Sequence, residues 1–265
     1  GAFSISCSMY LVCGYSIMYG GEIFLSGIEL DGATTAEVLT ETVLAESREK
    51  GFSGAAVYAD AADFFFQVVF VATAMSIVSG AVAERMKLWA FLAFAVVMTG
   101  LIYPMEGSWT WNCDDVFGLY NLGELDFSDF AGSGIVHLAG ASAALAGVIL
   151  LGSRRGKYGP DGQVYALQGA NLPLATLGSF ILWMGWFGFN GGSVLKLGDI
   201  SNANAVAMVF LNTNAAAAGG AIGALITARI MFGRADLTML LNGALAGLVA
   251  ITAEPSTPSA LEATL

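Results

Sequence analysis

Apolar residues dominate the chain in seven segments that are separated by polar connections. Each segment is close to the ~20 residues that an α-helix needs to cross the hydrocarbon core of a bilayer. Open strands cannot satisfy their backbone groups in lipid, so we expect every segment to be a helix. The segments are 1–20, 62–81, 87–105, 130–152, 168–190, 204–229 and 235–253. The pattern predicts an all-α integral membrane protein, with about seven transmembrane helices in one domain over residues 1–265.

The composition agrees with a membrane protein and argues against several other classes. Charged residues make up 12% of the chain and hydrophobic residues 56%, and the mean hydropathy is +0.71. A soluble domain usually carries about twice that charged share. One histidine and three scattered cysteines offer no metal-ligand spacing, and no nucleophile–base pair stands out. We therefore expect no metal, no cofactor and no enzymatic activity.

Basic residues set the orientation, because cytoplasmic loops carry an excess of Lys and Arg. Of the ten Lys and Arg in the chain, seven fall in connections on one side. These seven are Arg85, Lys87, Arg154, Arg155, Lys157, Arg229 and Arg234. That side is predicted to be cytoplasmic, which also places residue 1 in the cytoplasm and the protein in the cell membrane.

Acidic residues gather in the two connections on the opposite side, 21–61 and 106–129. A surface of that sign raises the local concentration of cations. The alternative is an ordinary solvated outer face. Both interpretations stay open at this point.

Small residues at helical spacing mark faces for close packing. Gly243 and Gly247 lie one turn apart, as do Gly140 and Ala144. Such faces let helix backbones approach closely in lipid, so we expect a tight helical bundle.

The only histidine, His137, lies within the apolar stretch DFAGSGIVHLAG at 129–140. It follows Asp129 by eight residues, about 12 Å along a helix, which places it near mid-depth in the bilayer. Ionisable groups at that depth are costly and usually mark a pathway, so we expect His137 to be a mostly neutral pore or proton-relay residue. For Asp129 two roles are equally compatible, namely a helix N-cap or a group that shapes an outer cation site.

Aromatic side chains near the outer side also allow two interpretations. Trp109 and Trp111 are expected in the outer connection, either as an interfacial belt or as faces that hold a cation. Phe66 and Phe70 lie one turn apart on one helix face, either as core or as rings that close a narrow pore.

Five ordered motifs together resemble the ammonium transporter, methylammonium permease and Rhesus superfamily, and fit its bacterial ammonium transporter branch best. The resemblance covers nearly the whole chain. The motifs are FQVVFVATAMSIVSGAVAER (66–85), DFAGSGIVHLAGASAALAGVILLGSRRG (129–156), WMGWFGFNGGS (183–193), FLNTNAAAAGG (210–220) and NGALAGLVAITAEP (242–255).

The resemblance implies a homotrimer in which each subunit has eleven helices and its own narrow apolar pore. The chain would then be an internal fragment with helices two to eight, without the first helix and the last three. The second of two paired pore histidines would lie outside it. A PII-type regulator is implied as a possible cytoplasmic partner.

The resemblance also implies roles for single residues. Phe66 and Phe70 match the stacked outer gate, and His137 matches the first pore histidine. Ammonium recruitment falls to Trp111, Ser193, Phe70 and Asp129. The implied function is transport of ammonium or ammonia, by recruitment of NH4+ at an acidic aromatic mouth, deprotonation and passage along His137. Two alternatives stay open: an ammonium sensor with an added cytoplasmic signalling domain, and a channel for other neutral gases.

Overall fold

A computed structural model describes residues 1–19, 60–112, 121–167 and 169–265. All named elements in these ranges are helices, and they form two compact units. The first unit contains Gly1–Gly80 and Met86–Phe127, and the second contains Ala81–Arg85 and Ser128–Leu265. Most acidic residues of the two predicted outer connections lie outside the described residues.

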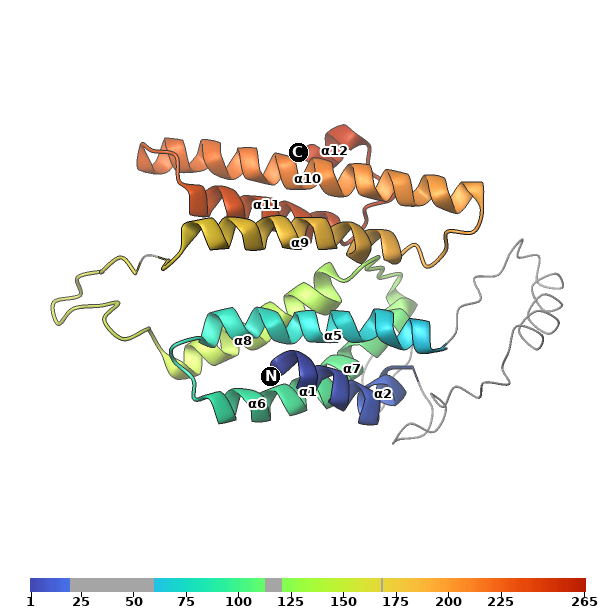
Figure 1. The fold of residues 1–265 in the computed structure, drawn as a ribbon, viewed down its shortest axis with the longest axis horizontal. Helices are drawn as coiled ribbons and strands as arrows, with labels where there is room; N and C mark the ends of the chain where they lie inside the picture. The colour runs from blue at the N-terminus through green and yellow to red at the C-terminus, as the bar shows by residue number, and fades with distance from the viewer. Residues whose placement is uncertain (20–59, 113–120, 168) are drawn as a thin grey trace. The chain divides into compact units, whose positions relative to one another are not determined.

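The first unit holds the first three predicted spans (Figure 1). Two of these spans are continuous helices that include π-helical turns, named η1, η3 and η4. A separate single turn, η6, follows them. The elements are α1 Ala2–Met9, η1 Tyr10–Gly14, α2 Tyr15–Tyr19, α5 Asp60–Val82, α6 Leu88–Val97, η3 Met98–Ile102, α7 Tyr103–Gly107, η4 Ser108–Asn112 and η6 Gly123–Leu125.

The third span corrects the predicted end of its helix. We expected Trp109 and Trp111 in the outer connection, but both lie in η4, and the helical span continues to Asn112. Pro104 has no N–H and its ring crowds the carbonyl four residues earlier, which normally breaks a helix. Here the preceding turn is π-helical, with the Tyr103 N–H donating to the Met98 carbonyl. The wider turn accommodates the proline, so the helix does not end there.

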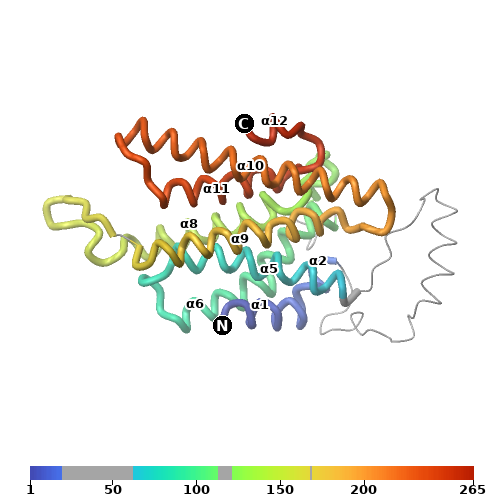
Figure 2. Tube along the Cα trace, turned by 45° about the horizontal axis from the view of Figure 1, so that its top comes forward, coloured from blue at the N-terminus to red at the C-terminus, as the bar shows by residue number. Residues whose placement is uncertain are grey.

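The second unit contains the remaining predicted spans. In it α9, α10 and α11 lie side by side in both views, and α12 packs on α10 (Figures 1 and 2). The elements are η7 Ser133–Leu138, α8 Ala139–Leu151, α9 Leu172–Gly192, α10 Ile200–Phe232, α11 Leu237–Ile251 and α12 Ala260–Thr264.

The backbones of α10 and α11 approach each other closely where the sequence has small residues. A Cβ built on Gly243 would lie 2.4 Å from the Gly220 carbonyl oxygen, and one on Gly247 would lie 2.1 Å from the Ala216 carbonyl oxygen. Only glycine fits at these two positions of α11. The close packing predicted from the Gly243 and Gly247 spacing is therefore confirmed.

Six helices in the described residues are long and apolar enough to cross a membrane, and they correspond to the first six predicted spans, with the third extending to Asn112. The seventh, α11, has 15 residues, or about 22 Å at 1.5 Å per residue. Its N-cap is Asp236, whose carboxylate accepts hydrogen bonds from the backbone N–H groups of Thr238 and Met239. The prediction of an all-α membrane fold is confirmed.

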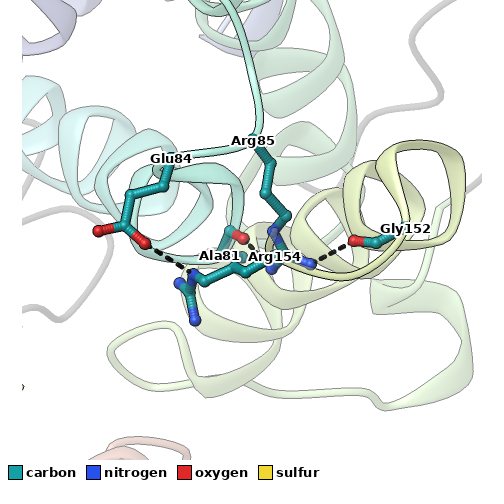
Figure 3. Close-up of polar contacts among 5 residues, drawn as sticks. All are labelled: Ala81, Glu84, Arg85, Gly152 and Arg154. Carbon is teal, nitrogen blue, oxygen red and sulfur yellow. Dashed lines mark hydrogen bonds and ion pairs between the residues drawn. The ribbon is translucent and has the colours of Figure 1, made fainter. Parts of the chain in front are cut away.

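Two of the basic residues predicted to be cytoplasmic join the turn after α5 to the end of α8 (Figure 3). Arg85 donates from Nη1 to the Gly152 carbonyl oxygen at 2.7 Å, and from Nη2 to the carbonyl oxygen of Ala81 in the last turn of α5. Arg154 Nε lies 3.5 Å from a carboxylate oxygen of Glu84. Arginine thus satisfies carbonyls that the two helix ends leave without an intrahelical partner.

Candidate functional site

In the first unit, three of the predicted site residues form one aromatic group. The ring centroids of Phe66 and Phe70 are 4.7 Å apart with the planes tilted by 58°. Trp111 meets Phe70 edge to face, with the centroids 5.7 Å apart and the planes at 88°. Phe70, at the middle of the group, is 1% exposed. The one-turn spacing on α5 and the continuation of the third span into η4 bring these rings together.

In the second unit, the Asp129 carboxylate accepts four backbone hydrogen bonds at the start of η7. Oδ1 accepts from Gly132 and Ser133 at 3.1 and 2.9 Å. Oδ2 accepts from Gly134 and Ile135 at 2.8 and 2.9 Å. These bonds occupy the four acceptor positions of an ionised carboxylate, and they satisfy the N–H groups that open a helix. The capping role of Asp129, one of the two considered, is present in the structure.

The sharp turn before η7 is made by Gly132, which has a φ of 100°. This left-handed conformation favours glycine because a Cβ would clash there. The turn aims the Gly132 carbonyl oxygen along η7. It accepts from the backbone N–H of Val136 at 3.0 Å and of His137 at 3.1 Å.

The His137 ring is buried between hydrogen-bonding and aromatic neighbours. Nδ1 lies 3.0 Å from the Gly132 carbonyl oxygen. A carbonyl oxygen can only accept, so Nδ1 carries the hydrogen, and Nε2 is the acceptor nitrogen of a neutral ring. One face stacks on Trp186, with centroids 5.1 Å apart and planes 23° apart, and Phe189 meets the ring at 5.7 Å and 63°.

Trp186 belongs to a buried polar chain that the sequence analysis missed. Its indole Nε1 donates to the Thr252 hydroxyl at 2.7 Å. The Thr252 hydroxyl lies 3.1 Å from Oδ1 of Asn190, whose Nδ2 donates to the Thr213 hydroxyl at 3.0 Å. The last three of these residues have no exposed surface. Trp186 and Asn190 are one turn apart on α9, and this spacing was the signal available in the sequence.

Ser193 ends α9, and its hydroxyl donates to the Phe189 carbonyl oxygen at 2.9 Å. It belongs to the second unit, together with Asp129 and His137, whereas Trp111 belongs to the first. A recruitment site shared by Trp111 and Ser193 therefore stays a prediction. The described part of the chain holds no group of three or more metal-ligating side chains.

The fold and these residues define a multi-span helical membrane protein with a histidine and aromatic rings enclosed in its spans. Comparison with known proteins narrows this class. The Ammonium Transporter Family matches residues 2–265, and the chain belongs to that family. Its members are transporters rather than enzymes, which agrees with the sequence prediction.

Named relatives and solved structures support the assignment. Ammonium transporter Amt2 of Archaeoglobus fulgidus is 46% identical over 194 residues, which cover 72% of this chain and 41% of the relative. A putative ammonium transporter of Synechocystis is 38% identical over 95% of this chain and 43% of the relative.

Two solved structures share the fold. The structure titled "Sensor Amt Protein" has a TM-score of 0.79 and 34% identity, and covers 99% of this chain and 60% of that one. Mep2 of Candida albicans has a TM-score of 0.77 and 25% identity, over 99% of this chain and 53% of that one. The chain therefore spans about half the length of the curated relatives it matches, 41% to 53% for the first three.

Proposed function

We propose that the full-length protein carries ammonium across the cell membrane, with NH4+ losing a proton on the way and ammonia passing His137. The observation that carries the proposal is the enclosure of His137. It is the only histidine of the chain, and it lies in an apolar helix between Trp186 and Phe189 in a member of the ammonium transporter family. Ionisable groups buried in a span are costly and usually mark a pathway, which supports a functional role for His137.

Recruitment falls to the aromatic group Phe66, Phe70 and Trp111 together with Ser193. A cation is attracted to the face of an aromatic ring, and Trp is the best of the aromatic side chains for this. The Ser193 hydroxyl, which now donates within its own helix, also has acceptor lone pairs for an N–H of the ion. The oxygens of Asp129 accept four backbone N–H groups at the start of η7. Asp129 therefore supports the site indirectly, because it orders the start of this helix.

The proton must leave before the apolar part of the path, because a bare cation is expensive to place in an apolar interior. We place this step beside Phe70, which closes the outer gate with Phe66. Neutral ammonia then meets Nε2 of His137, the nitrogen not held by Gly132. The unprotonated Nε2 can take up the released proton and give it back from the same nitrogen to the second pore histidine that the full-length protein is expected to supply.

The test uses the full-length protein in proteoliposomes, with ammonium-driven current and ammonia-driven alkalinisation measured in parallel. His137→Ala should abolish the current or uncouple it from ammonia flux. An unchanged proton-coupled current in a correctly assembled His137→Ala protein overturns the relay role. Absence of any ammonium-dependent signal in the wild type overturns transport itself.

The same proposal includes the assembly of the protein, its orientation in the membrane and its regulation. The protein would act as a homotrimer in the cell membrane, with residue 1 in the cytoplasm, acidic outer connections and a PII-type regulator on the inner side. Mass measurement in detergent tests the trimer. Labelling of an introduced cysteine beside residue 1 tests the orientation.

A second candidate is an ammonium sensor, and one observation favours considering it: the neighbour titled "Sensor Amt Protein" covers 99% of this chain. A signalling domain encoded after the last helix of the full-length protein, together with absent flux, would select the sensor. A channel for other gases requires equal permeability to carbon dioxide and ammonia in liposomes.

A further inference from the structure

We propose that Thr252 is a positioning residue for the pore histidine and acts on His137 through Trp186. The inference rests on the proposed transport function. The Thr252 hydroxyl bonds neither to the His137 ring nor to the aromatic gate. It instead accepts the only hydrogen bond that the Trp186 indole can donate, at 2.7 Å.

The indole needs this hydrogen bond because of where it lies. Trp186 is 8% exposed and Thr252 is fully buried, so water does not replace the acceptor. A buried N–H without a partner is costly, and the indole would turn to find another acceptor. The Thr252 hydroxyl therefore selects one orientation of the Trp186 ring.

The orientation of Trp186 in turn decides the surroundings of His137. The imidazole plane is 23° from the indole plane and lies 5.1 Å away between centroids. Rotation about the last side-chain torsion of histidine is broad and roughly two-fold, so the ring is fixed mainly by its neighbours. The Gly132 carbonyl holds Nδ1, while Trp186 supports the ring face. Both are needed to keep Nε2 directed at one place.

The hydroxyl of Thr252 is itself fixed by the rest of the polar chain. Its single hydrogen is shared between the Leu248 carbonyl oxygen at 2.7 Å and Oδ1 of Asn190 at 3.1 Å. Asn190 is held by Thr213 on α10. The chain therefore connects three helices behind Trp186, and a methyl group in place of the hydroxyl would remove the acceptor without changing the shape much.

The first experiment compares three variants of the full-length protein with the wild type in ammonium uptake. In Thr252→Val we expect the maximal rate to fall about tenfold, equivalent to ~1.4 kcal/mol of barrier. The apparent KM should change by less than about twofold, because the proposed recruitment residues are untouched. Thr252→Ser keeps the hydroxyl and should stay within about twofold of the wild-type rate. Thr176→Val is the matched control, since the Thr176 hydroxyl bonds only to its own helix at Leu172 on the same α9.

Non-additivity tests whether Thr252 works through Trp186. Trp186→Phe keeps an aromatic plane but cannot donate, so the double variant with Thr252→Val should be no slower than the slower single variant. If the two losses multiply, Thr252 acts separately and the proposal is wrong. It is also wrong if Thr252→Ser is as slow as Thr252→Val, or if Thr252→Val transports like the wild type.

Nitrogen NMR of histidine-labelled protein gives a readout that does not depend on transport. The His137 resonances are those lost in His137→Ala. The wild type should show one neutral tautomer with the hydrogen on Nδ1, and Thr252→Val a mixture of both tautomers. If Thr252→Val does not assemble, Trp186→Phe carries the same test, and a single Nδ1 tautomer in it overturns the proposal. A wild type that shows the single tautomer but no flux refutes the transport function alone.

Discussion

Asp129→Ala should destabilise the protein far more than the loss of an ordinary helix cap. The substitution removes the acceptor of four backbone N–H groups, those of residues 132 to 135. Two of these bonds, to Gly132 and Ile135, are buried. A buried donor left without a partner costs about 1–3 kcal/mol, so the two together cost about 2–6 kcal/mol. A typical N-cap is worth ~1 kcal/mol.

Asp129→Asn separates hydrogen bonding from charge. The amide keeps one oxygen, which can accept two of the four bonds, but its NH2 group faces the other two N–H donors. We therefore expect most of the loss seen in Asp129→Ala to remain in Asp129→Asn. A role confined to attracting cations would leave both variants as stable as the wild type and change only the apparent KM.

The assay is thermal unfolding of the purified full-length protein, followed by a fluorescent thiol probe and by size-exclusion chromatography. Domains of 150–250 residues lose about 2–4 °C of midpoint per kcal/mol, so a loss of 2–6 kcal/mol should lower the midpoint by several degrees. Asp161→Ala is the control, because Asp161 is exposed on the connection between α8 and α9. If Asp129→Ala unfolds at the same temperature as Asp161→Ala, the four bonds contribute nothing and the capping role is refuted.

Two further predictions concern packing and helix ends. Gly220→Val should prevent assembly, because even a Cβ at Gly220 would lie 2.2 Å from the Gly243 carbonyl oxygen. Gly223→Val is the control, since a Cβ at Gly223 meets open space. Size-exclusion profiles of the two variants check this prediction, and equal profiles would contradict it. Hydrogen bonds from the Thr238 hydroxyl and nearby backbone N–H groups hold the pKa of Asp236 below its usual range, so its cap is present at neutral pH and is lost as pH falls through that lowered pKa. The protection factors of the amides in the first turn of α11, which compare each rate with that of an unstructured peptide at the same pH, should therefore fall in Asp236→Ala and in acid. Protection factors independent of both would contradict the cap.

The spans could be predicted because their signal is local. Length and hydropathy alone placed the first six within a few residues, apart from the end of the third, since lipid demands a run of apolar side chains of fixed length. The third helix was predicted too short because its apolar run gives way to polar residues at Glu106, and nothing in the sequence announces that π-helical turns carry the helix on to Asn112. The position of Trp111 depended on those turns.

In the candidate site too, contacts within one stretch of chain could be predicted from the sequence, whereas contacts between distant stretches could not. Phe66 with Phe70 and the cap by Asp129 follow from spacing along one stretch of chain. The bond from Trp186 to Thr252 joins residues 66 positions apart and depends on how α9 meets the end of α11. Spacing cannot show such a contact, so the support of His137 emerges only from the packed structure.

Polar residues inside the spans nevertheless differ in how well they predict a contact with another part of the fold. A Ser or Thr hydroxyl can bond back to the carbonyl four residues earlier, as Thr73 and Thr176 do, so it needs no other helix. A buried Asn has two donors and an acceptor, more than one such carbonyl can satisfy. Asn242 bonds within its helix because it is exposed, whereas the fully buried Asn190 and Asn212 reach Thr213 on α10 and the chain after α11, respectively. An unsatisfied polar group is expensive in lipid, so an Asn that packing buries within an apolar run is expected to contact a second element of the fold, as Asn190 and Asn212 do.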